Sequence, residues 1–215
     1  MPYTQSIFLE NAMNVRMILF DIGNVLVELG DASLIRNFSN RDFPDSYFWE
    51  TWPTLQGVVD FESGKSDFQS FSECVIEFYD LELSVENFID IFRSGAKKKY
   101  EGVDEFLSRL SNSHELACLT NTNPIHWPKI RDDFELGKYF KKSYVSYELG
   151  LLKPNTSIFQ HVLDDTKLEA QEILFVEDNI ENIACAERLG FQCCHVKNFD
   201  NAKHMINTFL EHNTK

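Results

Sequence analysis

The sequence predicts an α/β fold: a doubly wound parallel sheet with a helical cap inserted after its first strand. Three observations predict it. Short apolar runs end in polar residues, amphipathic stretches lie between these runs, and the alternation stops in a long segment from about residue 31 to residue 100. Strands that alternate with helices are typical of a parallel sheet covered on both faces. A chain of 215 residues is long enough for one such core with a smaller insertion.

Four apolar runs are the expected strands, at residues 16 to 21, 115 to 121, 173 to 178 and 193 to 198. Each of the first three runs ends in polar or acidic residues. In an open parallel sheet, the ligand site lies beyond the carboxyl ends of the strands. We therefore expect five side chains to meet at one edge of the sheet: Asp21, Thr120, Asn121, Glu177 and Asp178.

Helices are expected between these strands. Residues 103 to 110 and 157 to 163 place apolar side chains at the i, i+3, i+4 and i+7 spacing of one helix face. Residues 180 to 190 are expected to form a helix that ends at Gly190, because glycine readily adopts the left-handed conformation that closes a helix.

The segment that breaks the alternation defines the expected domains. Residues 16–30 and 101–215 would form the α/β core, residues 31–100 the helical cap, and residues 1–15 a poorly ordered leader. The expected cap is rich in Phe, Trp and acidic residues. Its short basic run, Lys97 to Lys99, is interpreted as the solvated end of a helix.

Charge and cysteine usage exclude several classes of partner. The chain has 34 Asp and Glu against 20 Lys and Arg, a net charge of -14, which would repel nucleic acids and anionic membranes. No apolar run reaches membrane-spanning length. The five cysteines contain no C-x-x-C pair, which suits a reducing compartment, so we expect a cytoplasmic protein.

Four motifs occur in order along the chain: ILFDIGNVLVE, LACLTNTN, LLKPNTSIF and ILFVEDNIENI. Together they resemble the four motifs of the haloacid dehalogenase-like (HAD) hydrolase superfamily, and the resemblance extends from about residue 16 to residue 198. The first two motifs resemble most the group of bacterial α-glucose-1-phosphate phosphatases and the phosphatase-like N-terminal domain of epoxide hydrolases. The resemblance implies a HAD-like Rossmannoid core and a Mg²⁺-dependent phosphatase that acts on a small phosphorylated metabolite, with a sugar phosphate favoured.

The resemblance also implies roles for single residues. Asp21 matches the nucleophile that forms an aspartyl-phosphate intermediate. Thr120 and Asn121 match residues that hold the phosphate, and Lys153 matches the lysine that offsets its charge.

The implied Mg²⁺ site uses oxygen ligands, as this ion prefers. Asp21, the main-chain carbonyl of Gly23 and Asp178 would hold the ion, and Glu177 would act through water or from behind the direct ligands. Asn182 matches a position that steadies this loop.

Gly23 departs from the usual pattern. Most phosphatases of the superfamily carry at this position an Asp that protonates the leaving oxygen and later activates water. Such general acid and base catalysis contributes about 10² to 10⁴-fold. Glycine keeps the backbone carbonyl but lacks the carboxyl group, so we expect reduced activity or a preference for good leaving groups, such as anomeric or acyl phosphates.

Two other functions remain open. A 2-haloacid dehalogenase also lacks the second Asp, but it needs no metal, and the acidic pair at 177 and 178 would repel its carboxylate substrate. A phosphometabolite-binding or regulatory protein without strong activity would also explain Gly23. In each case the inner surface of the cap would choose the ligand. Trp49, Trp52 and residues 61 to 65 are candidates for it, although aromatic residues at such spacing more often form a core. His126 and Trp127, just after the second motif, could also reach a substrate.

Overall fold

The computed structural model describes residues 15–213, so the expected leader lies almost wholly outside the described residues. Five strands form a parallel sheet in the order β5-β4-β1-β6-β7. Their bounds are β1 (Met17–Phe20), β4 (Glu115–Thr120), β5 (Lys142–Val145), β6 (Ile173–Glu177) and β7 (Gln192–His195). This sheet confirms the predicted α/β fold.

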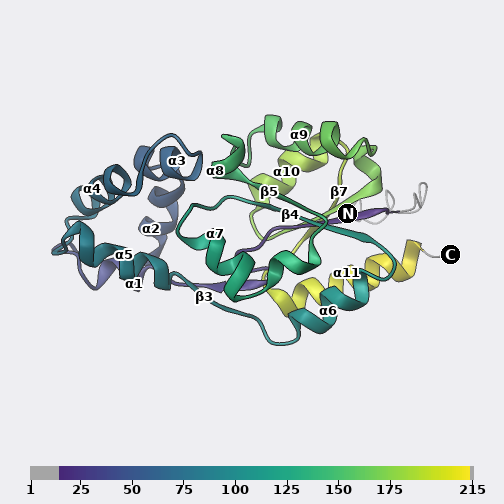
Figure 1. The fold of residues 1–215 in the computed structure, drawn as a ribbon, viewed down its shortest axis with the longest axis horizontal. Coiled ribbons are helices and arrows are strands. Elements are labelled where there is room, and N and C mark those ends of the chain that lie inside the picture. The colour runs from purple at the N-terminus through teal and green to yellow at the C-terminus, as the bar shows by residue number, and fades with distance from the viewer. Residues whose placement is uncertain (1–14, 214–215) are drawn as a thin grey trace, which may run out of the picture.

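Helices cover both faces of the sheet. α6 (Val103–Leu110) and α11 (Phe199–Asn213) lie on one face, and α9 (Thr156–Thr166) and α10 (Ile180–Arg188) lie on the other (Figure 1). Side chains of successive strand residues point to opposite faces, so Ile18 and Phe20 pack on the side of α6 and α11 while Leu19 packs on the side of α9 and α10. The sheet is therefore doubly wound.

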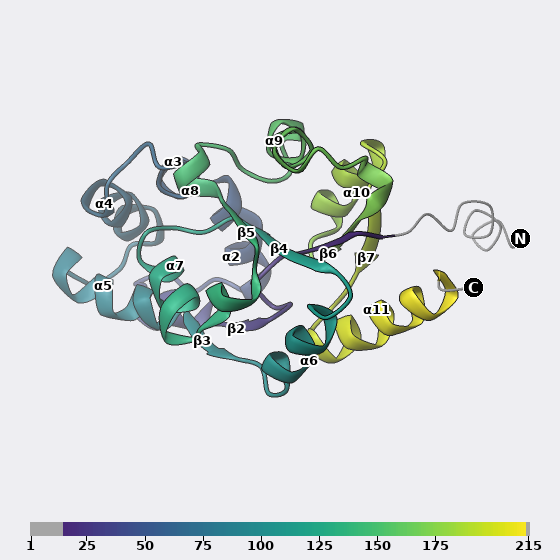
Figure 2. The ribbon, with the colours of Figure 1, turned by 45° about the vertical axis from the view of Figure 1, so that its right-hand side comes forward.

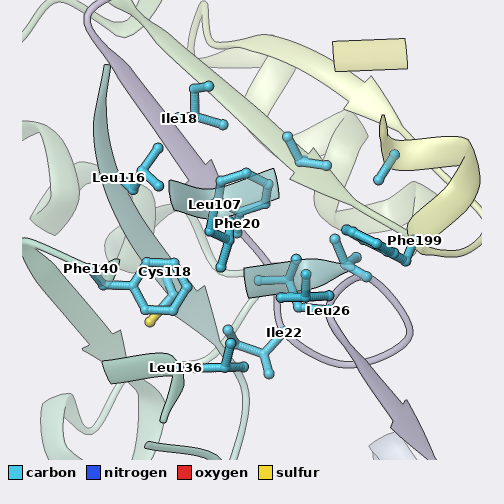
Figure 3. Close-up of a cluster of buried hydrophobic side chains, with 14 of the residues drawn as sticks. Ile18, Phe20, Ile22, Leu26, Leu107, Leu116, Cys118, Leu136, Phe140 and Phe199 are labelled. Atoms are coloured by element: carbon cyan, nitrogen blue, oxygen red, sulfur yellow. The ribbon is translucent and has the colours of Figure 1, made fainter. Parts of the chain in front are cut away.

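Figure 3 shows the apolar cluster on the first of these faces. Ile18 and Phe20 of β1 meet Leu116 and Cys118 of β4, and helices α6 and α11 close the cluster with Leu107 and Phe199. All six side chains are buried. Burial of apolar surface stabilises the folded state by about 25 cal/mol per Å², and this cluster therefore holds β1 at the centre of the molecule.

Between β2 (Val27–Leu29) and β3 (Ala96–Lys99) the chain forms a helical unit, defined as α1 to α5. Its helices are α1 (Ser33–Arg36), α2 (Asp45–Thr51), α3 (Gln56–Glu62), α4 (Phe68–Tyr79) and α5 (Val85–Ser94), with a 3-10 turn at Trp52–Thr54. The five lie together beyond one end of the sheet (Figures 1 and 2). Stacked aromatic rings form their own core, in which Phe61 and Phe71 have ring centroids 4.5 Å apart.

β2 and β3 pair as an antiparallel ribbon at the point where the chain leaves the core and returns to it. The interpretation of Lys97 to Lys99 as a helix end is wrong, because these residues form most of β3. Lys97 and Lys98 lie 3.5 and 3.7 Å from the carboxylate of Glu28 on β2, and Lys99 lies 2.5 Å from that of Asp104. The basic run is therefore paired within the protein.

The remaining elements are short. They are α7 (His126–Pro128), a π-helical turn at Lys129–Asp133, α8 (Ser146–Leu149) and 3-10 turns at Leu136–Tyr139 and Ala170–Glu172. Gly190, with φ of 90°, follows the end of α10 as predicted. In the stretch from residue 15 to residue 213, no helix is both long and apolar enough to cross a membrane.

The strand order places the site. The chain runs from β1 through the helical unit to β4 on one side of β1, and later crosses to β6 on the other side. In sheets of this kind, ligands bind where the connections diverge, beyond the carboxyl ends of the strands. Here that point lies beyond Phe20, Thr120 and Glu177.

Candidate active site

Asp21 is the first residue after β1 and is only 7% exposed. Its backbone N–H donates to the Val176 carbonyl at 2.9 Å, which continues the pairing of β1 with β6 and fixes the residue at the sheet edge. The expected nucleophile therefore lies at the divergence point, beside the residues that end the neighbouring strands.

Lys153 connects two of the predicted site residues. Its Nζ donates to Asp21 Oδ1 at 2.6 Å and to Glu177 Oε2 at 2.7 Å, and its side chain is only 2% exposed. Burial alone would lower the pKa of this ammonium group, but the charges of Asp21 and Glu177 outweigh burial and raise it. Lys153 is thus a fixed positive charge at the sheet edge.

Glu177 uses both carboxylate oxygens in hydrogen bonds. Oε2 accepts from Lys153 and, at 2.9 Å, from Asn182 Nδ2, while Oε1 accepts from the backbone N–H groups of Asp178 and Asn179. Burial would raise its pKa, but the Lys153 charge and these donors lower it. Glu177 therefore holds Lys153 and the start of the next loop in place, and Asn182 is buried beside it as a support.

Asn121 binds the lysine backbone. Its Oδ1 accepts from the Lys153 N–H and its Nδ2 donates to the Lys153 carbonyl, both at 2.9 Å. We expected this side chain to hold the phosphate. In the structure both ends of the amide join the loop after β4 to the loop that carries Lys153, so Asn121 positions the lysine.

Thr120 ends β4 and is 3% exposed. The loop after it is held by Ser146 of α8, whose Oγ accepts from the Thr122 N–H at 2.9 Å and donates to the Thr122 carbonyl at 3.0 Å. Next along the loop, Asn123 Oδ1 accepts from the N–H groups of Ile125 and His126. These bonds fix the backbone around the Thr120 hydroxyl.

Asp178 completes an acidic group. One carboxylate atom from each of Asp21, Glu177 and Asp178 lies within 4.8 Å of the others. Asp178 Oδ2 accepts from Asn24 Nδ2 at 2.9 Å, and His195 Nε2 lies 2.9 Å from the Asp178 carbonyl. The group has three carboxylates and one ammonium, so its net charge is negative when all are ionised.

The pKa values reflect this excess of negative charge. Burial and the charge of Glu177 raise the pKa of Asp21 to about 8, although Lys153 opposes them. Burial and the hydrogen bond with Glu177 raise the pKa of Asp178 to about 6. A divalent cation would relieve this repulsion, and carboxylate oxygens are the ligands that Mg²⁺ prefers. The acidic group therefore fits a metal ion, with Asp178 less occupied by hydrogen bonds than Glu177.

Gly23 faces a neighbouring side chain. A Cβ at this position would lie 2.8 Å from Leu29 Cδ1 and 3.8 Å from Asp21 Oδ2. Leu29 of β2 thus occupies the space into which a side chain at residue 23 would project.

A cavity of about 150 Å³ opens between the sheet edge and the helical unit. Gly23 and Thr120 line it from the core, and the helical unit contributes mostly apolar walls. Four of the residues expected to face a ligand line the cavity: Trp49, Trp52, Glu62 and His126. Burial lowers the pKa of His126 to about 4, and its Nε2 lies 2.6 Å from the Phe92 carbonyl, so it is a neutral structural group at physiological pH.

Sequence reasoning missed two contributors, Asn24 and Ser146. Asn24 stands in the first motif, three residues after Asp21, with a left-handed φ of 54° that Asn tolerates better than most residues. The position of Asn24 in the first motif could therefore have identified it from the sequence. Ser146 had no such signal, because its role depends on the contact between α8 and a loop 24 residues away.

Comparison with known proteins adds an independent line. A family model described as haloacid dehalogenase-like hydrolase matches residues 15–190. The D-ribitol-5-phosphate phosphatase of Bacteroides thetaiotaomicron is 26% identical over 195 residues, covering 86% of this chain and 93% of that protein. The chloroplast flavin mononucleotide hydrolase 1 of Arabidopsis thaliana is 27% identical over 134 residues, covering 61% of this chain and 53% of that protein.

Among solved structures, a HAD-family enzyme of Bacteroides thetaiotaomicron in complex with magnesium and inorganic phosphate has the same fold. Its TM-score is 0.73 at 24% identity, covering 89% of this chain and 99% of that one. The comparisons confirm the resemblance and the expected enzyme class, a phosphatase-type hydrolase. The chain belongs to the haloacid dehalogenase-like hydrolase family.

Proposed function

We propose that this protein is a Mg²⁺-dependent phosphatase that hydrolyses the phosphate ester of a small polyol or sugar through an aspartyl-phosphate intermediate on Asp21. One observation carries the proposal: the buried ammonium of Lys153 joins Asp21 to Glu177 while Asp178 lies beside them. This arrangement offers a nucleophile, a fixed cation and an acidic metal site within a few ångströms, as phosphoryl transfer requires.

The metal site would consist of Asp21, Asp178 and the main-chain carbonyl of Gly23. Glu177 would support it from behind, since both of its oxygens already accept hydrogen bonds. When bound, a divalent cation supplies positive charge that favours the ionised form of Asp21 and offsets the charge of the phosphate. The structural relative that was solved with magnesium and phosphate supports this assignment.

The side chains of the protein divide the remaining work. The Asp21 carboxylate would attack phosphorus, and Lys153 would balance the charge that spreads over the phosphoryl oxygens. Thr120, buried at the end of β4, would donate its hydroxyl to one of these oxygens. Asn121 would act on the phosphate indirectly, because it holds the backbone of Lys153.

The substrate class follows from the relatives and from the cavity. Ribitol 5-phosphate and flavin mononucleotide, which the relatives are named for, are both phosphate esters of a primary alcohol on a polyol chain. The cavity beside Thr120 has aromatic side chains, including Trp52 and Phe92, on the side of the helical unit. Aromatic faces of this kind pack against the C–H faces of a polyol or against a flat ring. We therefore favour a polyol or sugar phosphate.

The helical unit would act as a cap that closes over the sheet edge and excludes water. We place the protein in the cytoplasm, because the sulfurs of its five cysteines are all free thiols and free thiols persist in reducing compartments.

Phosphate release tests the proposal. The panel contains D-ribitol 5-phosphate, flavin mononucleotide, α-glucose 1-phosphate, acetyl phosphate and p-nitrophenyl phosphate, each with Mg²⁺ and with EDTA. We expect release that needs Mg²⁺ and that Asp21→Asn abolishes. Absence of release from every compound at saturating Mg²⁺ would favour a binding protein. Halide release from 2-chloropropionate in EDTA would favour a dehalogenase.

A further inference from the structure

Glu62 is the last residue of α3 and lines the cavity together with Gly23 and Thr120. It is partly buried, and its carboxylate takes part in none of the side-chain hydrogen bonds or ion pairs of residues 15–213. Charged side chains are rarely left inside a protein without a partner. We therefore expect this partly buried carboxyl group, which lies in a mostly apolar wall, to interact with a ligand in the cavity.

The end of α3 is held close to the core. Gly64, two residues after Glu62, has a left-handed φ of 69°, and a Cβ there would lie 2.2 Å from the Tyr147 carbonyl oxygen of α8. Ser63, which lies between them, donates its hydroxyl to the Val59 carbonyl at 2.7 Å. α8 in turn carries Ser146, which holds the loop after Thr120. Helix α8 thus positions both the end of α3, which carries Glu62, and the loop after Thr120.

The core lacks a carboxyl group of its own for proton transfer. Residue 23 is glycine, and Leu29 fills the space beside it. The substrates favoured above are alkyl phosphates, whose leaving alkoxides are strongly basic and depart well only when protonated. We propose that Glu62 is the general acid and base of this phosphatase, supplied by the helical unit in place of a carboxyl group at residue 23. This inference rests on the proposed function.

The proton balance is simple. As an oxygen of Asp21 forms a bond to phosphorus, the bond between phosphorus and the ester oxygen breaks, and the Glu62 carboxyl proton passes to that oxygen to give the free alcohol. In the second half, the Glu62 carboxylate accepts a proton from water while the water oxygen bonds to phosphorus. The bond between phosphorus and Asp21 then breaks, which releases phosphate and leaves both residues in their starting states.

The surroundings of Glu62 suit this cycle. Burial raises its pKa to about 7, although the charge of Lys153 partly opposes this. The other ionisable side chains that line the cavity are Asp31 and His126. Asp31 accepts from Ser33, which lowers its pKa, and His126 is neutral, so neither group replaces Glu62 as a proton donor near pH 7. A group half-protonated at neutral pH serves well as both acid and base.

Leaving-group dependence tests the role. We expect Glu62→Gln to lower kcat/KM for D-ribitol 5-phosphate by about 10² to 10⁴-fold, and kcat/KM for p-nitrophenyl phosphate, whose leaving group needs no proton, by less than about threefold. The ratio kcat/KM reports the phosphorylation of Asp21, whereas kcat also includes hydrolysis of the intermediate, in which Glu62 would accept a proton for both esters. The wild-type kcat/KM for the alkyl ester should fall above the Glu62 pKa of about 7, and this fall should vanish in the variant. Glu50→Gln, an exposed change on α2, is the matched control and should alter neither rate.

Equal loss of kcat/KM on both esters, or a higher KM with kcat unchanged, would overturn the proposal and make Glu62 a binding residue. Unchanged rates on both would also overturn it. Should Glu62→Gln fail to fold, Glu62→Asp replaces it and is expected to lower kcat/KM selectively for the alkyl ester. The proposed function fails in a different way, since wild-type protein would then release no phosphate even from p-nitrophenyl phosphate.

Discussion

Leu29 occupies the space that a side chain on Gly23 would need: a Cβ at residue 23 would lie 2.8 Å from Leu29 Cδ1. The contact joins the first motif to β2, the strand that leads into the helical unit. Leu29 therefore takes up the space that a carboxyl group at residue 23 would need. Introducing such a group requires Leu29 to move or to be replaced by a smaller residue.

We expect Gly23→Asp to destabilise the protein by about 1 to 3 kcal/mol, because extra atoms in a packed site force their neighbours to move. In a Leu29→Ala background the same change should cost less, since the obstructing methyl group is gone. Urea unfolding of the wild type, both single variants and the double variant measures this coupling, which we expect to be about 0.5 to 3 kcal/mol. Additive effects would mean that Leu29 does not obstruct residue 23.

Lys153→Met removes the one cation between Asp21 and Glu177. Breaking a buried ion pair by removing one partner costs about 3 to 5 kcal/mol. The pKa of Lys153 is raised in the fold, so its contribution is complete below the ordinary lysine pKa. The loss should shrink as the pH falls from 8 to 4, because the Asp21 carboxyl group, whose pKa is about 8 even beside Lys153, becomes protonated once the lysine is gone.

Urea unfolding at pH 4 and pH 8 gives both values for Lys153→Met. The control is Lys142→Met, which breaks an exposed pair with Asp165 and should cost at most about 1 kcal/mol. A cost for Lys153→Met as small as that of the control at pH 8 would contradict the assignment of a structural charge.

Asp178→Asn should stabilise the metal-free protein at neutral pH. The pKa of Asp178 is raised from 3.8 to about 6 in the fold, so the unfolded chain loses this proton first as pH rises. Stability is therefore lost between about pH 4 and pH 6. Asparagine has no proton to lose. The melting temperature of the Asp178→Asn protein should therefore exceed that of the wild type at pH 7.5 and match it near pH 4.

Added Mg²⁺ should reverse this order. A ligand at 100 times its Kd stabilises the folded state by about 2.7 kcal/mol, and only the wild type is expected to gain it. Melting curves with EDTA and with Mg²⁺ decide the point. An Asp178→Asn protein that gains as much from Mg²⁺ as the wild type would remove Asp178 from the metal site.

The sequence predicted the sheet core well where apolar runs ended in chemically distinctive residues. Asp21 follows a buried strand, and Thr120 and Glu177 are the last residues of two others, so both periodicity and position pointed to them. β5 was not predicted, because only Tyr144 and Val145 of its four residues are buried, which leaves no apolar run to detect.

Side-chain partners were harder to predict than positions. The motif placed Asn121 beside Thr120, but only the fold reveals that its amide binds the Lys153 backbone, 32 residues away in sequence. Likewise, Lys97 to Lys99 looked like a solvated helix end until their pairing with β2 became visible. Contacts between elements distant in sequence leave no local signal, and these contacts decide what each polar group does.

Gly64→Ala tests whether the docking of α3 on α8 positions the site. A Cβ at residue 64 would lie 2.2 Å from a backbone oxygen of Tyr147, so α3 must move away from the core. Gly150→Ala is the matched control, because its φ of 70° equals that of Gly64 within one degree but its nearest neighbour would be 3.9 Å away. Both changes carry the left-handed penalty of about 1 to 2 kcal/mol.

Only Gly64→Ala adds the displacement of α3. We expect it to lower kcat for D-ribitol 5-phosphate at least about tenfold beyond the control, because a misplacement of about 1 Å in a catalytic group costs up to about 100-fold. Steady-state rates of both variants with Mg²⁺ measure the difference. Equal kcat values in the two variants would show that activity does not depend on this contact, and that closure of the helical unit is set elsewhere.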